Sequence, residues 1–360
     1  MLNKHLLTFF ATPTVFIQAA TARQWTEFLQ QAREHGLTAR FYYLLQQHNL
    51  LDQVPVQVRL HGKSAAYYAE KQQHSLYFEL QQLESLFVQA GCPCILLKGA
   101  AYRALALPMS FGRLFADIDI LVPTSRLKQI RDKLFFNGFA EGAMSNYDRD
   151  YYINWSHQNP PLQHYQRGTV IDLHHHIYPT ASAKKIDITP IFNHAQSMPG
   201  SVFKVPKAVH LFIHAAVHLF YQEESHKLVK DIIDLNDLLL EVEQQQQLSL
   251  LMEQARLMAV QSAVINACWV LAELFANKTA LTVLANAAEK PQLGVGKLLL
   301  SMLRGRTVTA WLARKIWFVR GHGLKMRWQI LLYHTLAKPL VITRNWLQRV
   351  IDTDTDTKRG

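Results

Sequence analysis

Apolar and polar residues are spaced differently in three successive stretches of the chain. From about residue 22 to residue 90, apolar side chains such as Trp25 and Phe28 recur every three or four positions among good helix formers. After Gly91 the pattern changes to short runs of β-forming residues, and from Pro206 onward helical spacing returns without a further strand signal. The pattern therefore predicts a strand-containing segment between two helical ones.

Strands and helices alternate in the middle segment. The pattern predicts strands at 94–97, 118–122 and 169–177, and a broken β-rich region at 151–165. Helices are expected at 100–107 and 125–137. This alternation indicates a small α/β unit of roughly 90 residues.

The whole chain is then expected to have an α+β fold, with a small mixed sheet flanked by helical regions. We expect an N-terminal helical segment at 1–90, an α/β core at 91–205 and a C-terminal helical domain at 206–360. A length of 360 residues with 49% hydrophobic content is enough to bury a full core.

Carboxylates interrupt two of the apolar runs. Asp117 and Asp119 are two residues apart, so on a strand they share one face while the apolar residues between and after them face the other way. Neighbouring like charges are unfavourable unless a cation lies between them, and Mg²⁺ prefers such oxygen ligands together with phosphates. An isolated pair of this kind also fits a cap and a solvent-facing side chain, but Asp172, within a second apolar run, adds a third candidate ligand. The three carboxylates favour phosphoryl or nucleotidyl transfer.

A possible phosphate-binding turn precedes these carboxylates. Lys98 and Gly99 follow an apolar run and begin a helix, where free backbone N–H groups and a glycine allow a phosphate to approach closely. An ordinary strand-to-helix turn with an exposed lysine has the same sequence pattern.

The order of these motifs resembles the uncharacterised bacterial nucleotidyltransferase family of the polymerase β-like superfamily, over roughly residues 90–240. The residues that carry the resemblance are Lys98, Gly99, Arg113, Asp117, Asp119, Asp172 and His174.

This resemblance implies a minimal nucleotidyltransferase fold that moves a nucleoside monophosphate from an NTP to an acceptor. It implies that the three aspartates are catalytic and hold Mg²⁺ or Mn²⁺, and that the other four residues lie near the nucleotide. The turn Lys98-Gly99-Ala100 departs from the Gly-Ser of the broader superfamily, which affects the details of triphosphate binding.

Histidines suggest two other kinds of site. The run 174–176 is compatible with a transition-metal site, although we expect these residues to line a polar wall, with His174 the functional member. His214 and His218 are four residues apart on an expected helix, and with Asp231 they are compatible with a metal-dependent phosphohydrolase. The absence of an adjacent His-Asp pair favours packing and hydrogen bonding between the helical domain and the α/β unit.

Two further function classes stay open. Glycosyltransferases also use an Asp-x-Asp motif, but the long helical segment before the first expected strand argues against one. A non-catalytic module that binds a membrane or nucleic acid is the other alternative.

Charge is concentrated at the C-terminal end. The net charge is +11, and residues 301–360 hold twelve Lys and Arg against three Asp. Tryptophans such as Trp311 and Trp317 are interleaved with these cations, which favours peripheral contact with an anionic membrane over binding to nucleic acid. A basic surface above core tryptophans is the structural alternative. Three cysteines without paired spacing and no signal-like N-terminus favour the cytoplasm, with peripheral attachment at the inner membrane as an option.

Overall fold

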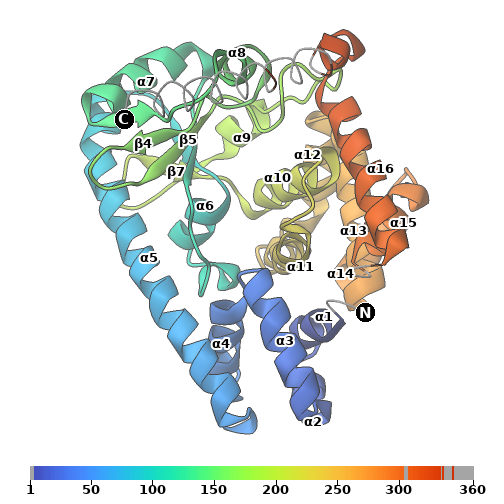
Figure 1. Ribbon diagram of the computed structural model, residues 1–360. Helices are drawn as coiled ribbons and strands as arrows, with labels where there is room; N and C mark the ends of the chain where they lie inside the picture. Colours follow the sequence, from blue (N-terminus) through green and yellow to red (C-terminus); the bar gives the residue numbers. More distant parts are fainter. Residues whose placement is uncertain (1–3, 304–306, 334, 336–342, 344–360) are drawn as a thin grey trace, which may run out of the picture.

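The computed structural model describes residues 4–303, 307–333, 335 and 343. Figure 1 shows a sheet with one long helix along its outer side and a group of C-terminal helices on its other side. In the described part of the chain, every strand lies between residues 94 and 205. The predicted α+β fold, with a small mixed sheet between helical regions, is confirmed.

The N-terminal helices have recognisable capping residues at their ends. Thr21 and Gln24 form a capping box at the start of α3, and Gly91 ends α5 in the left-handed conformation at φ 58°. Aromatic rings from three of these helices pack together, with Phe28 at the centre of the cluster. The helices are α1 (Lys4–Ala11), α2 (Pro13–Ala19), α3 (Ala22–Glu34), α4 (Thr38–Gln47) and α5 (Val56–Ala90), with the 3₁₀ turn η1 (Leu51–Gln53) before α5.

The sheet has seven short strands in the order β3-β4-β5-β2-β1-β7-β6. Strand β2 pairs in parallel with β5, and β1 with β7, whereas the other pairs are antiparallel. The strands are β1 (Cys94–Leu96), β2 (Ile118–Leu121), β3 (Phe139–Glu141), β4 (Leu162–His164), β5 (Val170–His174), β6 (Gln196–Ser197) and β7 (Phe203–Val205). Strands β5, β2 and β1 lie in the middle, where Ile95, Ile120 and Ile171 are fully buried.

One sequence prediction within this region was wrong. The segment 151–165 was expected to be β-rich, but its first part belongs to helix α8 and only β4 follows. The Ser145 side chain caps this helix by accepting a hydrogen bond from the Asp148 N–H, and this cap outweighs the β propensity of the tyrosines. The helices between strands are α6 (Lys98–Ala104), α7 (Leu127–Phe136), α8 (Asn146–Trp155) and α9 (Thr189–His194), with 3₁₀ turns η2 (Pro108–Ser110) and η3 (Thr124–Arg126).

Helix α10 is the centre of the C-terminal helices. It is buried on nearly all sides and packs against α11, α12, α13 and α16. The helices are α10 (Ala208–Tyr221), α11 (Leu228–Gln244), α12 (Leu248–Leu257), α13 (Gln261–Phe275), α14 (Lys278–Asn286), α15 (Leu293–Met302) and α16 (Val308–Lys325). Among the helices of the described residues, none has both the length and the apolar character that crossing a bilayer requires.

The N-terminal and C-terminal helices also touch each other, because α1 packs on α11 and α13. We propose that the chain consists of an N-terminal helical segment at 1–90, an α/β core at 91–205 and a C-terminal helical domain at 206–360, since the strands are confined to the middle range in the described part of the chain.

Candidate active site

The parallel pairing of β2 with β5 places two carboxylates side by side. Asp119 is the direct neighbour of Asp172, and two positions further along Leu121 is the neighbour of His174. Because alternate residues of a strand share a face, Asp172 and His174 lie on the same side of β5. One potential ligand atom from each of Asp119, Asp172 and His174 lies within 4.8 Å of the others. The sequence prediction that carboxylates from two strands converge therefore holds for Asp119 and Asp172.

Asp119 is the most enclosed of the acidic residues. It is 3% exposed, and its Oδ1 accepts hydrogen bonds from Lys98 Nζ at 2.7 Å and pairs with His174 Nε2 at 2.8 Å. Burial by itself raises the pKa of Asp119, but the charges and hydrogen bonds of Lys98 and His174 together outweigh it and hold that pKa well below its usual range. Burial likewise lowers the pKa of Lys98, and Asp119, together with Asp117 and Asp172, more than offsets this. Asp119 is therefore an anion at neutral pH.

Asp172 and Asp117 lie at the two sides of this cluster. Asp172 is half-buried and its Oδ2 accepts a hydrogen bond from Gln158 Nε2 at 2.9 Å. Asp117 was expected on the strand itself, but it lies one residue before β2 and outside the group of three ligand atoms. Burial, reinforced by Asp119, raises the pKa of both Asp117 and Asp172.

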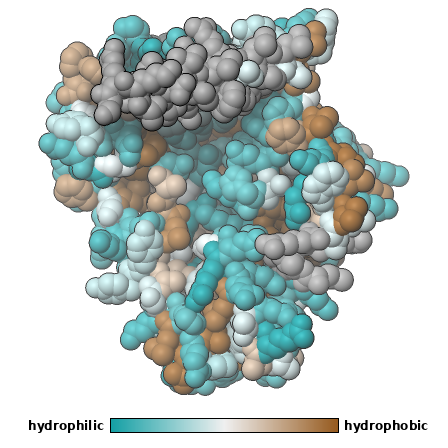
Figure 2. Space-filling model, viewed as in Figure 1, coloured by the Kyte–Doolittle hydropathy of each residue, from teal (hydrophilic) through white to brown (hydrophobic). Residues whose placement is uncertain are grey.

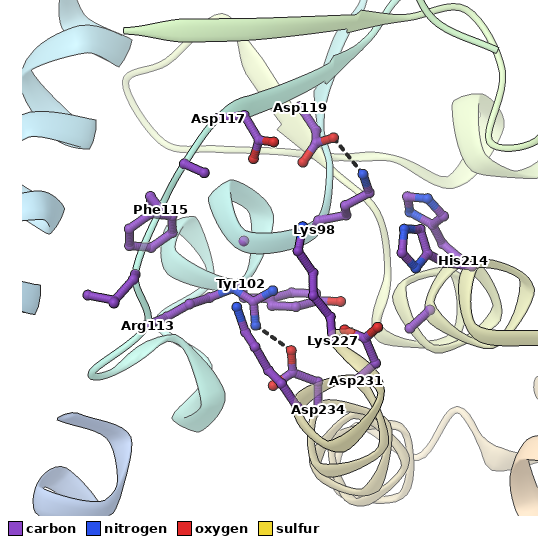
Figure 3. Close-up of a pocket in the computed structure, with 16 residues that line it drawn as sticks. Lys98, Tyr102, Arg113, Phe115, Asp117, Asp119, His214, Lys227, Asp231 and Asp234 are labelled. Atoms are coloured by element: carbon purple, nitrogen blue, oxygen red, sulfur yellow. Dashed lines mark hydrogen bonds and ion pairs between the residues drawn. The ribbon is translucent and has the colours of Figure 1, made fainter. Parts of the chain in front are cut away.

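Two adjoining pockets open onto these residues. Both are lined by Lys98, Asp117 and Lys227, and also by His218. The first pocket, which we call the α11 pocket, extends along Tyr102 and α11 (Figure 3). The second, which we call the α8 pocket, extends from Asp172 between α8, the end of α10 and the end of α16. A substrate in either pocket can therefore reach the carboxylates.

Comparison with known protein families gives this geometry a context. The chain matches the model of an uncharacterised nucleotidyltransferase family over residues 21–276. It belongs to that family. The match confirms the resemblance seen in the sequence, and it implies a nucleoside triphosphate substrate. No curated protein and no solved structure matched the chain.

The family match includes every strand of the sheet, the whole α11 pocket, and the α8 pocket apart from His322, Lys325 and Met326. It favours the nucleotidyltransferase interpretation over the glycosyltransferase and the phosphohydrolase. Helix α16 and the basic C-terminal end lie outside the matched residues.

Gly99 of the nucleotidyltransferase lies beneath the loop that precedes β2. A Cβ atom on Gly99 would be 3.0 Å from Arg113 Nε and 3.2 Å from the Phe115 ring. This close packing gives a structural reason for the glycine. Lys98, immediately before it, has φ 44°, so the turn between β1 and α6 is left-handed. The expected strand, turn and helix order around Lys98 and Gly99 is present.

Arg113 is held at the far end of the α11 pocket. Its Nη1 pairs with Asp234 of α11, and its guanidinium lies 5.1 Å from the centre of the Tyr102 ring. Asp234 also pairs with Arg40 of α4 at 2.5 Å. Burial lowers the pKa of Arg113, but Asp234, together with Tyr102 and Asp231, more than offsets this, so the guanidinium stays charged. Arg113 thus lies in the pocket wall, already bound to a carboxylate.

His214 and His218 line the α11 pocket from α10, next to Lys98 (Figure 3 labels His214). Burial, with a further contribution from Lys98, lowers the pKa of His214 to about 3 and that of His218 well below its usual value. Both rings are therefore neutral. Their position between α10 and the sheet agrees with the expected junction, whereas within the described residues neither ring has a hydrogen-bond partner.

Sequence reasoning missed Lys227 and Lys230, which line the α11 pocket at the start of α11. It also missed Gln158, which donates to Asp172. Lysines near a helix start are usual on a solvated surface, so their spacing gave no signal. Only the packing of α11 against the loop before β2 brings them to the site.

Proposed function

We propose that this nucleotidyltransferase moves a nucleoside monophosphate from an NTP to an acceptor hydroxyl and releases pyrophosphate. The observation that carries the proposal is the strand register that makes Asp119 and Asp172 neighbours, with His174 at ligand distance. In a member of a nucleotidyltransferase family, neighbouring carboxylates beside two substrate-sized pockets support metal-assisted transfer.

The donor atoms suit a hard divalent cation. Carboxylate oxygens of Asp119 and Asp172 favour Mg²⁺, and an imidazole such as His174 is also accepted by Mn²⁺. Lys98 and His174 both contact Oδ1 of Asp119, which leaves its Oδ2 for an ion. We infer that Asp119 and Asp172 hold the cation, with Asp117 as a further carboxylate ligand. Such an ion polarises phosphate oxygens and neutralises charge that develops on them.

Asp172 is placed to take the acceptor's proton. Gln158 occupies Oδ2, so Oδ1 is available to accept a hydrogen bond from a hydroxyl in the α8 pocket. The hydroxyl oxygen attacks the α-phosphorus and forms the new O–P bond, while the bond from that phosphorus to the bridging oxygen breaks. The proton moves to Asp172, and the bonding electrons leave with pyrophosphate.

The remaining site residues offset the negative charge of the phosphates or hold other site residues in place. Lys98, which bonds to Asp119, offsets negative charge near the α-phosphate. Gly99 lets the loop that carries Arg113 pack against α6, and Arg113 adds positive charge at the far end of the pocket. His174 orients Asp119 through its Nε2 and lies next to the expected nucleotide position.

Replacement of Asp119 tests this function. Asp119→Asn should reduce transfer of label from an α-³²P-labelled NTP by more than about 100-fold, because the anionic ligand is lost. Asp132→Asn is the matched control, since Asp132 lies on α7, half-exposed, and among the described residues forms ion pairs only with Lys128 and Arg131. The assay runs with Mg²⁺, with Mn²⁺ and with EDTA. Full activity of Asp119→Asn, or activity that persists in EDTA, contradicts the assignment.

A second proposal concerns the surface of α16. We infer that this helix contacts an anionic membrane, because its outer face is apolar and the C-terminal end is strongly basic. Figure 2 shows apolar side chains along the edge of the molecule where Figure 1 places α16. Val308 is 82% exposed, Val319 70% and Trp311 58%, and Lys315 lies over the Trp311 ring. Residues 301–360 add twelve Lys and Arg against three Asp, which complements anionic headgroups.

Vesicle sedimentation tests the membrane proposal. The protein should sediment with phosphatidylglycerol vesicles and not with phosphatidylcholine vesicles, and the double variant Trp311→Glu, Val319→Glu should lose this binding. Phe136→Glu is the control, because Phe136 is 85% exposed but lies at the end of α7. Unchanged sedimentation of the double variant contradicts the proposal. Binding to an oligonucleotide in place of vesicles also contradicts it.

A further inference from the structure

The start of α11 brings two cations to the α11 pocket that have no carboxylate partner within the described residues. Lys227 and Lys230 both line this pocket, and neither forms an ion pair or a hydrogen bond in the described part of the chain. By contrast, Lys98 is bound to Asp119 and Arg113 to Asp234. The two cations predicted from the sequence thus already pair with carboxylates, whereas the two lysines of α11 can bind an anionic ligand.

The surroundings of Lys230 are unfavourable for an ammonium group on its own. The side chain is half-buried, and burial together with the nearby Arg113 lowers its pKa to about 8. Asp231 and Asp234 act in the opposite direction, but Asp234 is already shared by Arg113 and Arg40. A half-buried cation beside another cation is stabilised when an anion binds between them.

His214 gives an independent indication of a ligand on the same wall. It is 5% exposed, it lines the pocket, and it has no hydrogen-bond partner within the described residues. Its ring is neutral, because burial lowers its pKa to about 3, so one ring nitrogen carries a hydrogen that can be donated. The ring nitrogens of His214 are accessible from the pocket, so this N–H can donate to an anionic ligand there.

Helix α11 itself contributes to the same place. It has 17 residues, begins after Lys227, and no side chain caps its first turn. The Leu228 N–H donates to the Ser225 carbonyl oxygen, but the other N–H groups of the first turn and the helix dipole favour an anion at this end. Figure 3 shows Lys227 and Asp231 projecting from α11 into the space between Lys98 and Asp234.

We propose that Lys227, Lys230 and His214 bind the β- and γ-phosphates of the NTP and then hold pyrophosphate after transfer. This inference rests on the proposed function and assigns the α11 pocket to the leaving group. The acceptor consequently approaches from the α8 pocket, where Asp172 and Gln158 face it. In-line displacement then requires the acceptor to attack from the α8 pocket while pyrophosphate leaves into the α11 pocket.

Asp231 makes the proposal more specific, because it is an acid in the same pocket. Burial, reinforced by Asp234, raises its pKa to about 6, so it is mostly charged at neutral pH and repels a phosphate. Removing this charge should therefore strengthen pyrophosphate binding, whereas removing either lysine should weaken it. A merely structural role for these residues would not produce opposite signs.

Titration calorimetry with inorganic pyrophosphate and Mg²⁺ is the test. We expect Lys227→Met and Lys230→Met each to weaken binding about tenfold, the loss of one charge-assisted hydrogen bond, and Asp231→Asn to strengthen it about threefold. Lys278→Met is the control, because Lys278 is an exposed lysine at the start of another helix, α14. Thermal unfolding of each variant shows that the fold is retained.

Three results overturn the proposal: no pyrophosphate binding by the wild type, unchanged binding in both lysine variants, or equal losses in Lys278→Met. These outcomes are separate from failure of the proposed function, which Asp119→Asn decides by nucleotide transfer. If transfer depends on Asp119 but the lysine variants bind pyrophosphate normally, only the assignment of the α11 pocket is wrong. If the lysine variants lose binding while no transfer occurs, the anion site stands and the transferase function fails.

Discussion

Arg40 of α4 and Asp234 of α11 form a buried ion pair between residues 194 positions apart in the sequence. The guanidinium also pairs with Asp237, and the second oxygen of Asp234 pairs with Arg113 from the loop before β2. One carboxylate thus joins an N-terminal helix, a C-terminal helix and the loop that leads to Asp117. The position of the active-site loop consequently depends on both helical regions.

The first prediction follows from this network. Arg40→Met should lower the free energy of unfolding by about 3 kcal/mol, because it leaves the half-buried Asp237 without this partner and the buried Asp234 with one cation in place of two. Urea denaturation measures the loss. Arg59→Met is the control and should cost less than about 1 kcal/mol, since Arg59 pairs with Asp52 at the surface. Equal urea midpoints for Arg40→Met and Arg59→Met would show that the buried ion-pair network does not stabilise the fold.

Gly112 allows the same loop to lie against α4. Its φ is 72°, and a Cβ atom would be 2.4 Å from the Arg40 backbone nitrogen. We predict that Gly112→Ala destabilises the protein by about 3 kcal/mol and also lowers activity, because the backbones must separate. Gly36→Ala separates the two causes: φ there is 65° with nothing within 4 Å, so only the conformational cost of about 1 kcal/mol applies. If thermal unfolding shows similar losses of stability for Gly112→Ala and Gly36→Ala, the close approach of the Gly112 and Arg40 backbones is not the cause.

The sequence predicted the parts of the fold that depend on local pattern. Strand alternation around Asp119 and Asp172 was enough to place two carboxylates on apolar strands, and the change of spacing after Gly91 separated the sheet from the helices. The β prediction near Tyr151 was wrong, because the Ser145 side chain caps and stabilises a helix there.

Long-range packing could not be predicted in the same way. Nothing in the local pattern near Arg40 indicates a partner such as Asp234, since an arginine among polar residues also fits a solvated helix face. Likewise, Lys230 reaches the α11 pocket only because α11 packs beside the loop that carries Arg113. The convergence of Asp119 and Asp172 could therefore be predicted from the sequence, whereas the pocket walls required the three-dimensional structure.

Asp231 should make stability depend on pH. Its pKa is raised to about 6 in the folded protein, from an ordinary value near 3.8, so the folded state holds its proton more tightly. This contribution is fully present below about pH 4 and is lost as pH rises through about 6. Asp231→Asn, which cannot ionise, should therefore gain about 2 kcal/mol relative to the wild type between pH 4 and pH 7. Urea unfolding at both pH values measures the gain, and a difference that does not change with pH would contradict the assignment.

Gln158 should affect turnover through Asp172. Its Nε2 donates to Asp172 Oδ2 at 2.9 Å, and both side chains line the α8 pocket. Gln158→Leu should lower kcat about tenfold, because a carboxylate that rotates freely is less often in position to accept the acceptor's proton, while KM for the NTP stays unchanged. Gln158→Glu, which removes the donor at neutral pH and adds charge, should lower kcat further. Steady-state kinetics with a labelled NTP and water as acceptor gives both parameters. If Gln158→Leu raises KM for the NTP and leaves kcat unchanged, Gln158 contacts the nucleotide and the two pockets have the opposite roles.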